Sequence, residues 1–217
     1  MSWGKDDSGR GDGPPGTRRS YHHGNLREAL IKAALDLISE KGPAGFTFAE
    51  AARAAGVSPA APYRHFRDRD ALLADVARQG FAAFADALAA AWGGGKPGAR
   101  EAFERVGRAY LAFAREEPAY FAAMFESGLS AADYPDLRLE GDRAFGVLRE
   151  ACEAVLAPLP KERRPPAMMM ALHIWALSHG IAALFARGDR ARRPIPMRPE
   201  DLLEAATLIY LDGLAGE

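Results

Sequence analysis

The sequence predicts an all-α protein with a small three-helix head and a larger C-terminal helical bundle. Apolar residues recur at helical spacing in one segment after another, Pro or Gly separates these segments, and no segment shows the sustained alternation of a strand. A short Ala- and Gly-rich stretch, residues 46–66, has the pattern of two helices joined by a tight turn. We therefore expect an N-terminal arm over residues 1–20, a head over 21–70 and a body over 71–217.

The N-terminal arm is rich in Gly, Pro and charge, so it cannot bury much apolar surface and is predicted to be disordered. Arg18 and Arg19 close it, where a basic arm could reach nucleic acid or simply be solvated. Asn25 is a suitable N-cap for a first helix, and Gly42 with Pro43 ends that helix.

The next two helices form a predicted helix-turn-helix. Thr47 can cap the first of them, and Gly56 stands where it must stop, because Gly takes the left-handed conformation at little steric cost. Val57 can fill the gap between the helices. Ser58 is a good N-cap for the second helix, with Pro59 at its first position. In such a unit the second helix enters the major groove of DNA.

A fourth helix is predicted from about Arg69 to Trp92, followed by a Gly-rich break at residues 93–98. This break lacks the preceding strand and the Lys-Ser/Thr ending of a phosphate-binding loop. The body then continues in helical patterns over residues 99–115, 118–127, 135–157, 164–187 and 199–214.

Composition excludes several kinds of protein. Of the 217 residues 48% are apolar, which is enough for a proper core. Cys152 is the only cysteine, so the chain has no disulfide framework, and we expect a core thiol. We find no nucleophile–base pair, paired carboxylates or cofactor motif, and His173 and His179 lie six residues apart without a nearby carboxylate. The sequence therefore predicts a non-enzyme with no catalytic residues, cofactor or metal.

No apolar run approaches the roughly 20 residues that span a bilayer, and the N-terminus lacks an apolar signal core. These two observations predict a cytoplasmic protein. Charge is unevenly distributed: residues 17–70 hold nine Lys or Arg against six Asp or Glu, and residues 71–217 hold 17 against 20. A basic head on an acidic body suits a head that meets phosphate, although a solvated surface could also show this difference.

Residues 20–80 resemble the TetR family of transcriptional regulators, whose DNA-binding domain would cover about residues 24–84. The resemblance rests on Thr47, on Ala52 with Gly56-Val57-Ser58, on Tyr63-Arg64-His65-Phe66, and on Arg69 with Ala71-Leu72-Leu73. A second motif, Trp175, His179 and Gly180, resembles the C-terminal domain type named for its Trp-His-Gly (WHG) signature.

The resemblance implies a set of DNA contacts. Phosphate contacts would come from Thr47, Tyr63, His65 and Arg69, and base edges would face Ala60 and Ala61. Arg64 could read guanine or bind phosphate. Pro62 departs from the common family pattern, which leaves the docking angle open. The full predicted DNA-binding set is Arg18, Arg19, Thr47, Ser58, Ala60, Ala61, Tyr63, Arg64, His65 and Arg69.

In the body, the last two helices are the expected surface for a homodimer, because the first of them is apolar almost all round. The resemblance implies a pocket for a small apolar or aromatic effector, although core packing is the more common role for any single aromatic residue. The predicted pocket residues are Tyr110, Phe113, Phe121, Phe125, Phe145, Trp175 and His179. His179 could instead make a buried hydrogen bond.

These expectations favour a ligand-responsive transcriptional regulator, most simply a repressor released from a palindromic operator by its effector. The alternative is a helical bundle that binds small molecules and carries a vestigial DNA-binding head.

Overall fold

The computed structural model describes residues 26–186 and 195–215, and every secondary-structure element within these ranges is a helix. The predicted arm, Arg18, Arg19 and the Asn25 cap lie outside the described residues. The described α-helices are α1 (Leu26–Lys41), α2 (Phe48–Ala54), α3 (Arg69–Trp92), α4 (Ala99–Glu116), α5 (Pro118–Phe125), α6 (Pro135–Leu156), α7 (Ala167–Ala186) and α8 (Pro199–Ala215). Three short 3-10 helices join them: η1 (Ala61–Arg64), η2 (Gly93–Gly95) and η3 (Lys161–Arg163).

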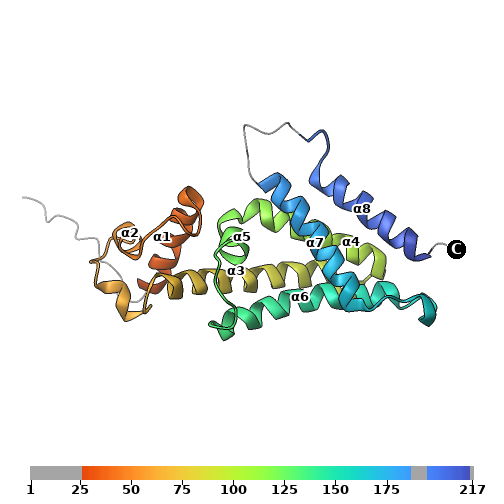
Figure 1. The fold of residues 1–217 in the computed structure, drawn as a ribbon, viewed down its shortest axis with the longest axis horizontal. Helices are drawn as coiled ribbons and strands as arrows, with labels where there is room; N and C mark the ends of the chain where they lie inside the picture. Colours follow the sequence, from red (N-terminus) through yellow and green to blue (C-terminus); the bar gives the residue numbers. More distant parts are fainter. Residues whose placement is uncertain (1–25, 187–194, 216–217) are drawn as a thin grey trace, which may run out of the picture.

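The helices form an elongated molecule with the head at one end (Figure 1). The head contains α1, α2 and η1. From it α3 runs into the body, where α6 lies alongside and makes the most extensive helix–helix packing of the fold. The C-terminal end of α8 lies far from the head.

The long helix α3 belongs to two hydrophobic cores. Its first half contributes Leu72, Leu73 and Val76 to the head core, all three fully buried. Its second half contributes Phe84 and Leu88 to the body core. Both ends are well capped: the Asp68 carboxylate accepts a hydrogen bond from the Ala71 amide at 2.7 Å, and Gly93 ends the helix in the left-handed conformation. One continuous element therefore links head and body.

The predicted second helix of the helix-turn-helix is the main correction to the sequence analysis. We expected an α-helix from Pro59 to His65, but the structure has only the 3-10 helix η1. Ser58 does not cap it through its side chain; instead its carbonyl oxygen accepts a hydrogen bond from the amide of Ala61 at 3.0 Å. Pro62 has no N–H to donate to Ser58 as an α-helix would require, so the tighter turn replaces the first α-helical turn.

The expectation about apolar runs was also wrong. Ala167–Phe185 in α7 is a 19-residue stretch that is long and apolar enough to cross a membrane, by length and composition alone. In the fold, α7 packs against α4, α6 and α8, and 33% of the stretch is buried. A helix is also apolar on all sides when one side packs in the intramolecular core and another side packs against a partner subunit.

Cys152 lies fully buried in α6, as the sequence predicted for a core thiol. Burial is the main cause that raises the pKa of this thiol to about 12. The thiol is therefore protonated and unreactive at neutral pH.

Candidate DNA-binding surface and effector pocket

The head presents a helix-turn-helix whose first helix is firmly capped. The hydroxyl of Thr47 accepts the Glu50 amide at 3.2 Å, and the Glu50 carboxylate accepts the Thr47 amide at 2.8 Å, which completes a capping box. Lys41 donates to the same carboxylate at 2.7 Å. These hydrogen bonds, that of Lys41 first, lower the pKa of Glu50 to about 2. The cap orients α2 and also holds α2 to the end of α1.

The tip of η1 is exposed and polar. Tyr63 is 63% exposed, and its ring makes an edge-on contact with Phe48, with centroids 5.0 Å apart. Arg64 and His65 are exposed, and their side chains make no hydrogen bond or ion pair with any residue that the structure describes. Ser58 and Ala60 are exposed beside them, whereas Ala61 is half-buried. This surface offers the Arg64 guanidinium and several hydrogen-bond donors to an anionic partner.

Arg69, predicted to bind phosphate, has its guanidinium group engaged within the head. It donates to the carbonyl oxygen of Phe46 at 2.8 Å, to that of Pro43, and to Asp70 at 2.8 Å. Its guanidinium carbon also lies 4.7 Å from the centre of the Phe46 ring. The side chain ties the start of α3 to the loop before α2, which is a structural role that spacing alone did not predict.

A cavity of about 50 Å³ lies in the body between α3, α4, α5, α6, α7 and α8. That volume holds about four water molecules at roughly 10–15 Å³ each, so a larger ligand requires the walls to move. The aromatic residues that line it are Phe81, Phe84, Phe103, Tyr110, Phe125, Phe145 and Trp175. Four of the seven predicted pocket residues, Tyr110, Phe125, Phe145 and Trp175, are therefore placed at the cavity.

The other three predicted residues, Phe113, Phe121 and His179, do not line the cavity but support its wall. Phe113 packs against Phe84 with ring centroids 5.0 Å apart. The ring of Phe121 stacks on that of His179 at 5.4 Å and 21°. Helical periodicity does not separate a wall from the layer behind it, which is why the sequence grouped them together.

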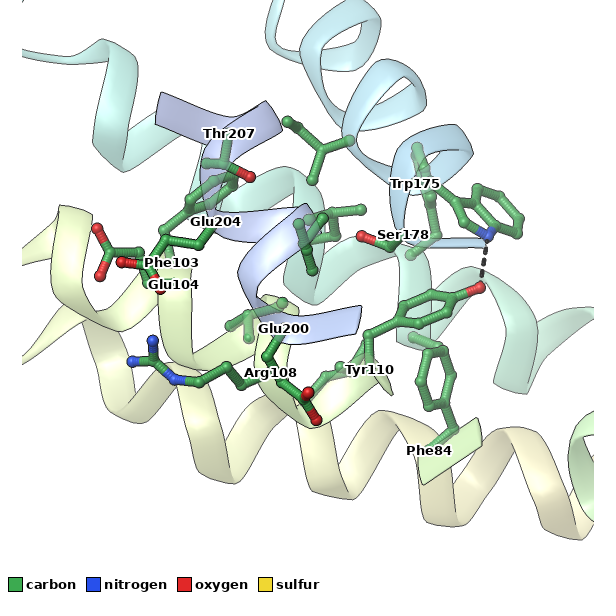
Figure 2. Close-up of a pocket in the computed structure, with 18 of the residues that line it drawn as sticks. Phe84, Phe103, Glu104, Arg108, Tyr110, Trp175, Ser178, Glu200, Glu204 and Thr207 are labelled. Atoms are coloured by element: carbon green, nitrogen blue, oxygen red, sulfur yellow. Dashed lines mark hydrogen bonds between the residues drawn. The ribbon is translucent and has the colours of Figure 1, made fainter. Parts of the chain in front are cut away.

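A chain of hydrogen bonds joins the wall to this second layer. The indole Nε1–H of Trp175 donates to the hydroxyl oxygen of Tyr110 at 3.2 Å, as Figure 2 shows, and that hydroxyl lies 3.0 Å from Nδ1 of His179. Burial lowers the pKa of His179, which favours the neutral ring, so Nδ1 accepts and the Tyr110 hydroxyl donates. Burial likewise raises the pKa of Tyr110, which keeps its proton in place.

Comparison with known proteins assigns both parts of the chain. Residues 30–76 match the family model described as "Bacterial regulatory proteins, tetR family", and residues 103–208 match "Tetracyclin repressor-like, C-terminal domain". The chain belongs to the TetR family. Its C-terminal domain is of the WHG type that Trp175, His179 and Gly180 suggested.

Solved structures agree with this TetR assignment. A protein of unknown function from Rhodococcus sp. RHA1 is 31% identical over 91% of this chain and 100% of that one, with a TM-score of 0.74. The TetR family regulator PfmR from Thermus thermophilus is 22% identical over 85% and 96% of the two chains, with a TM-score of 0.64. The fatty acid degradation regulator FadR from Bacillus halodurans is 14% identical over 89% and 98%, with a TM-score of 0.69. The last two likenesses show the fold alone. A comparison with curated proteins finds no match.

In this TetR chain the short helix α5 touches both cores. Phe121 and Phe125 face the His179 ring, and Phe125 also lines the cavity. Ala123 is fully buried in the head core, and α5 packs directly against α1. A Cβ atom on Gly80 of α3 would lie only 2.8 Å from the sulfur of Met124, so α3 and α5 approach closely. A displaced cavity wall would therefore press on the head through α5 as well as α3.

The outer faces of α7 and α8 expose several large apolar side chains. Those more than one-third exposed are Met168, Met169, Leu172, Leu184, Leu208 and Ile209, and Ile209 reaches 75%. A group of exposed apolar side chains on two neighbouring helices is typical of a protein–protein interface.

Sequence reasoning missed the charged side chains at the cavity. Glu104 and Arg108 line it from α4, and Glu200 and Glu204 line it from α8. Each pair is four residues apart, which places both members on one helix face. In the sequence alone, charged residues four positions apart are typical of a solvent-exposed helix face, and only the packing of α4 against α8 shows that they lie at a cavity.

Proposed function

We propose that this TetR family member is a ligand-responsive repressor that binds a palindromic operator as a homodimer and is released by a small apolar or aromatic effector. In this proposal it acts in the cytoplasm and by binding rather than by catalysis. One observation carries the proposal: α3 begins beside the exposed tip of η1 and continues unbroken into the wall of the cavity. A ligand in the cavity therefore has a direct mechanical connection to the DNA-facing surface.

For operator binding we propose the exposed set Thr47, Ser58, Ala60, Tyr63, Arg64 and His65. Arg64 supports the proposal most directly because its guanidinium is free and can bind either a phosphate or the edge of a guanine. Arg18 and Arg19, just before the head, remain proposed contacts from the resemblance. Arg69 is better assigned to holding the head together, given its three hydrogen-bond partners there.

The dimer is proposed to form through the exposed apolar faces of α7 and α8. Small residues on α7, Ala176, Gly180 and Ala183, are exposed beside Leu172 and Leu184 and would permit close approach of a partner helix. Two heads are needed because helix-turn-helix proteins bind half-sites about 34–36 Å apart, or a multiple of that spacing.

Release would follow from expansion of the small cavity. A ligand larger than its volume must displace Phe84, Phe125 or Trp175, and the helices that carry them are α3, α5 and α7. The displacement of α3 and α5 changes the separation of the two heads. A coupling free energy of about 1–3 kcal/mol between effector and operator would be enough for regulation.

The test is selection of bound fragments of the source genome by purified full-length protein at two salt concentrations. We expect a palindrome with half-sites one helical turn or a multiple apart. The double variant Tyr63→Ala/Arg64→Ala should lose at least about tenfold of the operator affinity, since each good base or phosphate contact contributes roughly 1–3 kcal/mol. Arg149→Ala/Arg138→Ala, which also removes exposed cations but from α6, is the matched control and should bind normally.

Sequence-independent binding alone, or no binding, would favour the vestigial-head alternative. The protein would then be a small-molecule-binding bundle, and the Tyr63→Ala/Arg64→Ala double variant would leave every measurable activity unchanged.

A further inference from the structure

The mouth of the cavity has a chemistry that its aromatic walls do not share. Figure 2 shows Glu104 and Arg108 of α4 and Glu200 and Glu204 of α8 grouped on one side, away from the hydrogen bond between Tyr110 and Trp175. The cavity therefore has an aromatic interior and a charged entrance between α4 and α8.

The two helices approach closely at Gly107 of α4 and Leu203 of α8. A Cβ atom on Gly107 would lie 3.0 Å from a terminal methyl of Leu203, so the absence of a side chain at 107 is what seats Leu203 against α4. Both residues line the cavity. A ligand that enters between α4 and α8 must displace Leu203 and passes the charged side chains on either side of it.

The charge at the entrance is predominantly negative. Three carboxylates line the cavity against one guanidinium, that of Arg108. Arg115 pairs with Glu200 at 2.8 Å but also with Glu116, and Arg100 lies 3.8 Å from both Glu104 and Asp212. Arg198, which pairs with Asp201, also interacts electrostatically with Glu200 and Glu204. Adding all these partners leaves six carboxylates against four guanidinium groups. Glu204 makes no hydrogen bond or ion pair with any residue that the structure describes, and it is exposed.

The interior also suits a cation more than an anion. Seven aromatic residues line it, and the face of an aromatic ring carries negative electrostatic potential, which attracts organic cations and repels carboxylates and phosphates. The hydroxyl of Tyr110 is already hydrogen-bonded to Trp175 and His179, so it does not offer its proton to an anionic ligand.

We propose that the effector is an amphipathic organic cation. Its apolar body replaces Leu203 and enters among the aromatic rings, and its cationic head remains at the entrance between Glu104 and Glu204. This inference rests on the proposed function, because it names the ligand of the same cavity.

The experiment compares three probes with the same alkyl chain: decyltrimethylammonium, decanol and decanoate. Their binding to the full-length protein is measured by titration calorimetry below the micelle threshold, and release of the protein from its selected operator is measured in parallel. We expect decyltrimethylammonium to bind at least about fivefold more tightly than decanoate and to release the operator at lower concentration.

The variant that tests the entrance is Glu104→Gln/Glu204→Gln. It should weaken decyltrimethylammonium binding by about fivefold, the combined effect of two partly exposed charge contacts, and should change decanol binding by less than about twofold. Glu153→Gln/Glu162→Gln removes the same charge from exposed positions outside the cavity lining and should leave all three affinities unchanged. Arg108→Gln should weaken only decanoate.

Equal or tighter binding of decanoate, an unchanged cation affinity in the Glu104→Gln/Glu204→Gln variant, or no binding of the cation would each overturn the inference. The proposed function is judged separately: sequence-specific operator binding by the unliganded protein would survive any of these outcomes. Loss of specific operator binding would instead overturn the proposed function, whatever the probes do.

Discussion

The two halves of α3 pack into surroundings of different kinds. In the head half, Leu72, Leu73 and Val76 are fully buried among short helices, and an ion-pair network centred on Asp75 adds polar connections. In the body half, Phe81, Phe84 and Leu88 line a cavity that aromatic rings surround. One half is buried in the head core and the other borders a cavity, although both lie on the same helix.

This difference suits a protein that must hold one surface constant while changing another. In the proposed function, the head needs a fixed shape to present Tyr63 and Arg64 to DNA. The body would admit a ligand and transmit the resulting strain, and packed interiors respond to such strain by switching between discrete arrangements.

The largest expected effect is a cavity in the head core. Leu72→Ala should reduce the free energy of unfolding by about 2–5 kcal/mol, the range for fully buried leucines. Phe145→Ala, in the cavity wall and only half-buried, should cost about 1–2 kcal/mol, because fewer packed neighbours are lost there. Urea unfolding of both variants checks the difference. Equal losses would mean that the body wall is packed as tightly as the head.

The next effect concerns the charge network that fastens α1 to α3. Asp75 is only 7% exposed and pairs with Arg27 at 3.0 Å and Arg78 at 3.1 Å, and Gln79 donates to it at 3.2 Å. Asp75→Asn leaves two guanidinium groups without their partner and should destabilise the protein by about 2 kcal/mol.

Asp86 is the matched control for Asp75, since it lies on the same helix and pairs with Arg143 at 2.6 Å but is 73% exposed. Asp86→Asn should cost less than about 1 kcal/mol, as exposed ion pairs do. If both substitutions cost the same in thermal or urea unfolding, burial does not distinguish the head network from the body surface.

The head could be predicted from the sequence far better than the cavity, and the reason is the range of the interactions. Thr47 and Gly56 act on backbone atoms within a few residues, so local spacing reveals them. The same holds for the bounds of α3, which the apolar stripe and Gly93 predicted correctly. The failure at η1 came from Pro62, whose local effect on the helix was underestimated.

The cavity depends on contacts between residues distant in the chain. Tyr110 meets His179 across 69 positions, and Gly107 meets Leu203 only because α8 folds back onto α4. Of the residues predicted from aromatic content, Tyr110, Phe125, Phe145 and Trp175 lie at the cavity, and whether an effector binds there stays a prediction. Phe125 lies on the cavity wall and Phe121 lies behind it because of how the helices pack. The charged entrance also depends on this packing, which local sequence patterns do not reveal.

A smaller effect is expected at the α2 cap. Thr47→Ala removes the acceptor for the Glu50 amide and should cost about 1 kcal/mol in unfolding, whereas Thr47→Ser keeps the hydroxyl and should cost much less. Because the pKa of Glu50 is lowered from 4.5 to about 2, the cap contributes stability that is present above pH 4.5 and lost as the pH falls toward 2. Thermal unfolding across this range should therefore show a shallower acid loss for Thr47→Ala, and parallel curves would contradict the capping box.

The smallest effect is expected at His179, behind the cavity wall. Burial lowers its pKa below the ordinary 6.5, so the unfolded chain takes up a proton first as the pH falls. The stability from the neutral ring is present above pH 6.5 and decreases below it, as the Tyr110 hydroxyl loses its acceptor at Nδ1. His179→Gln should reduce the dependence of the melting temperature on pH between about pH 7.5 and 5.5. His173→Gln, which changes an exposed histidine of the same helix, should retain the wild-type slope.

Because a ligand that moves Trp175 also disturbs the Tyr110 hydroxyl, effector saturation should change this slope in the wild type and leave it unchanged in His179→Gln. A slope that is the same with and without effector would show that the second layer does not sense the cavity.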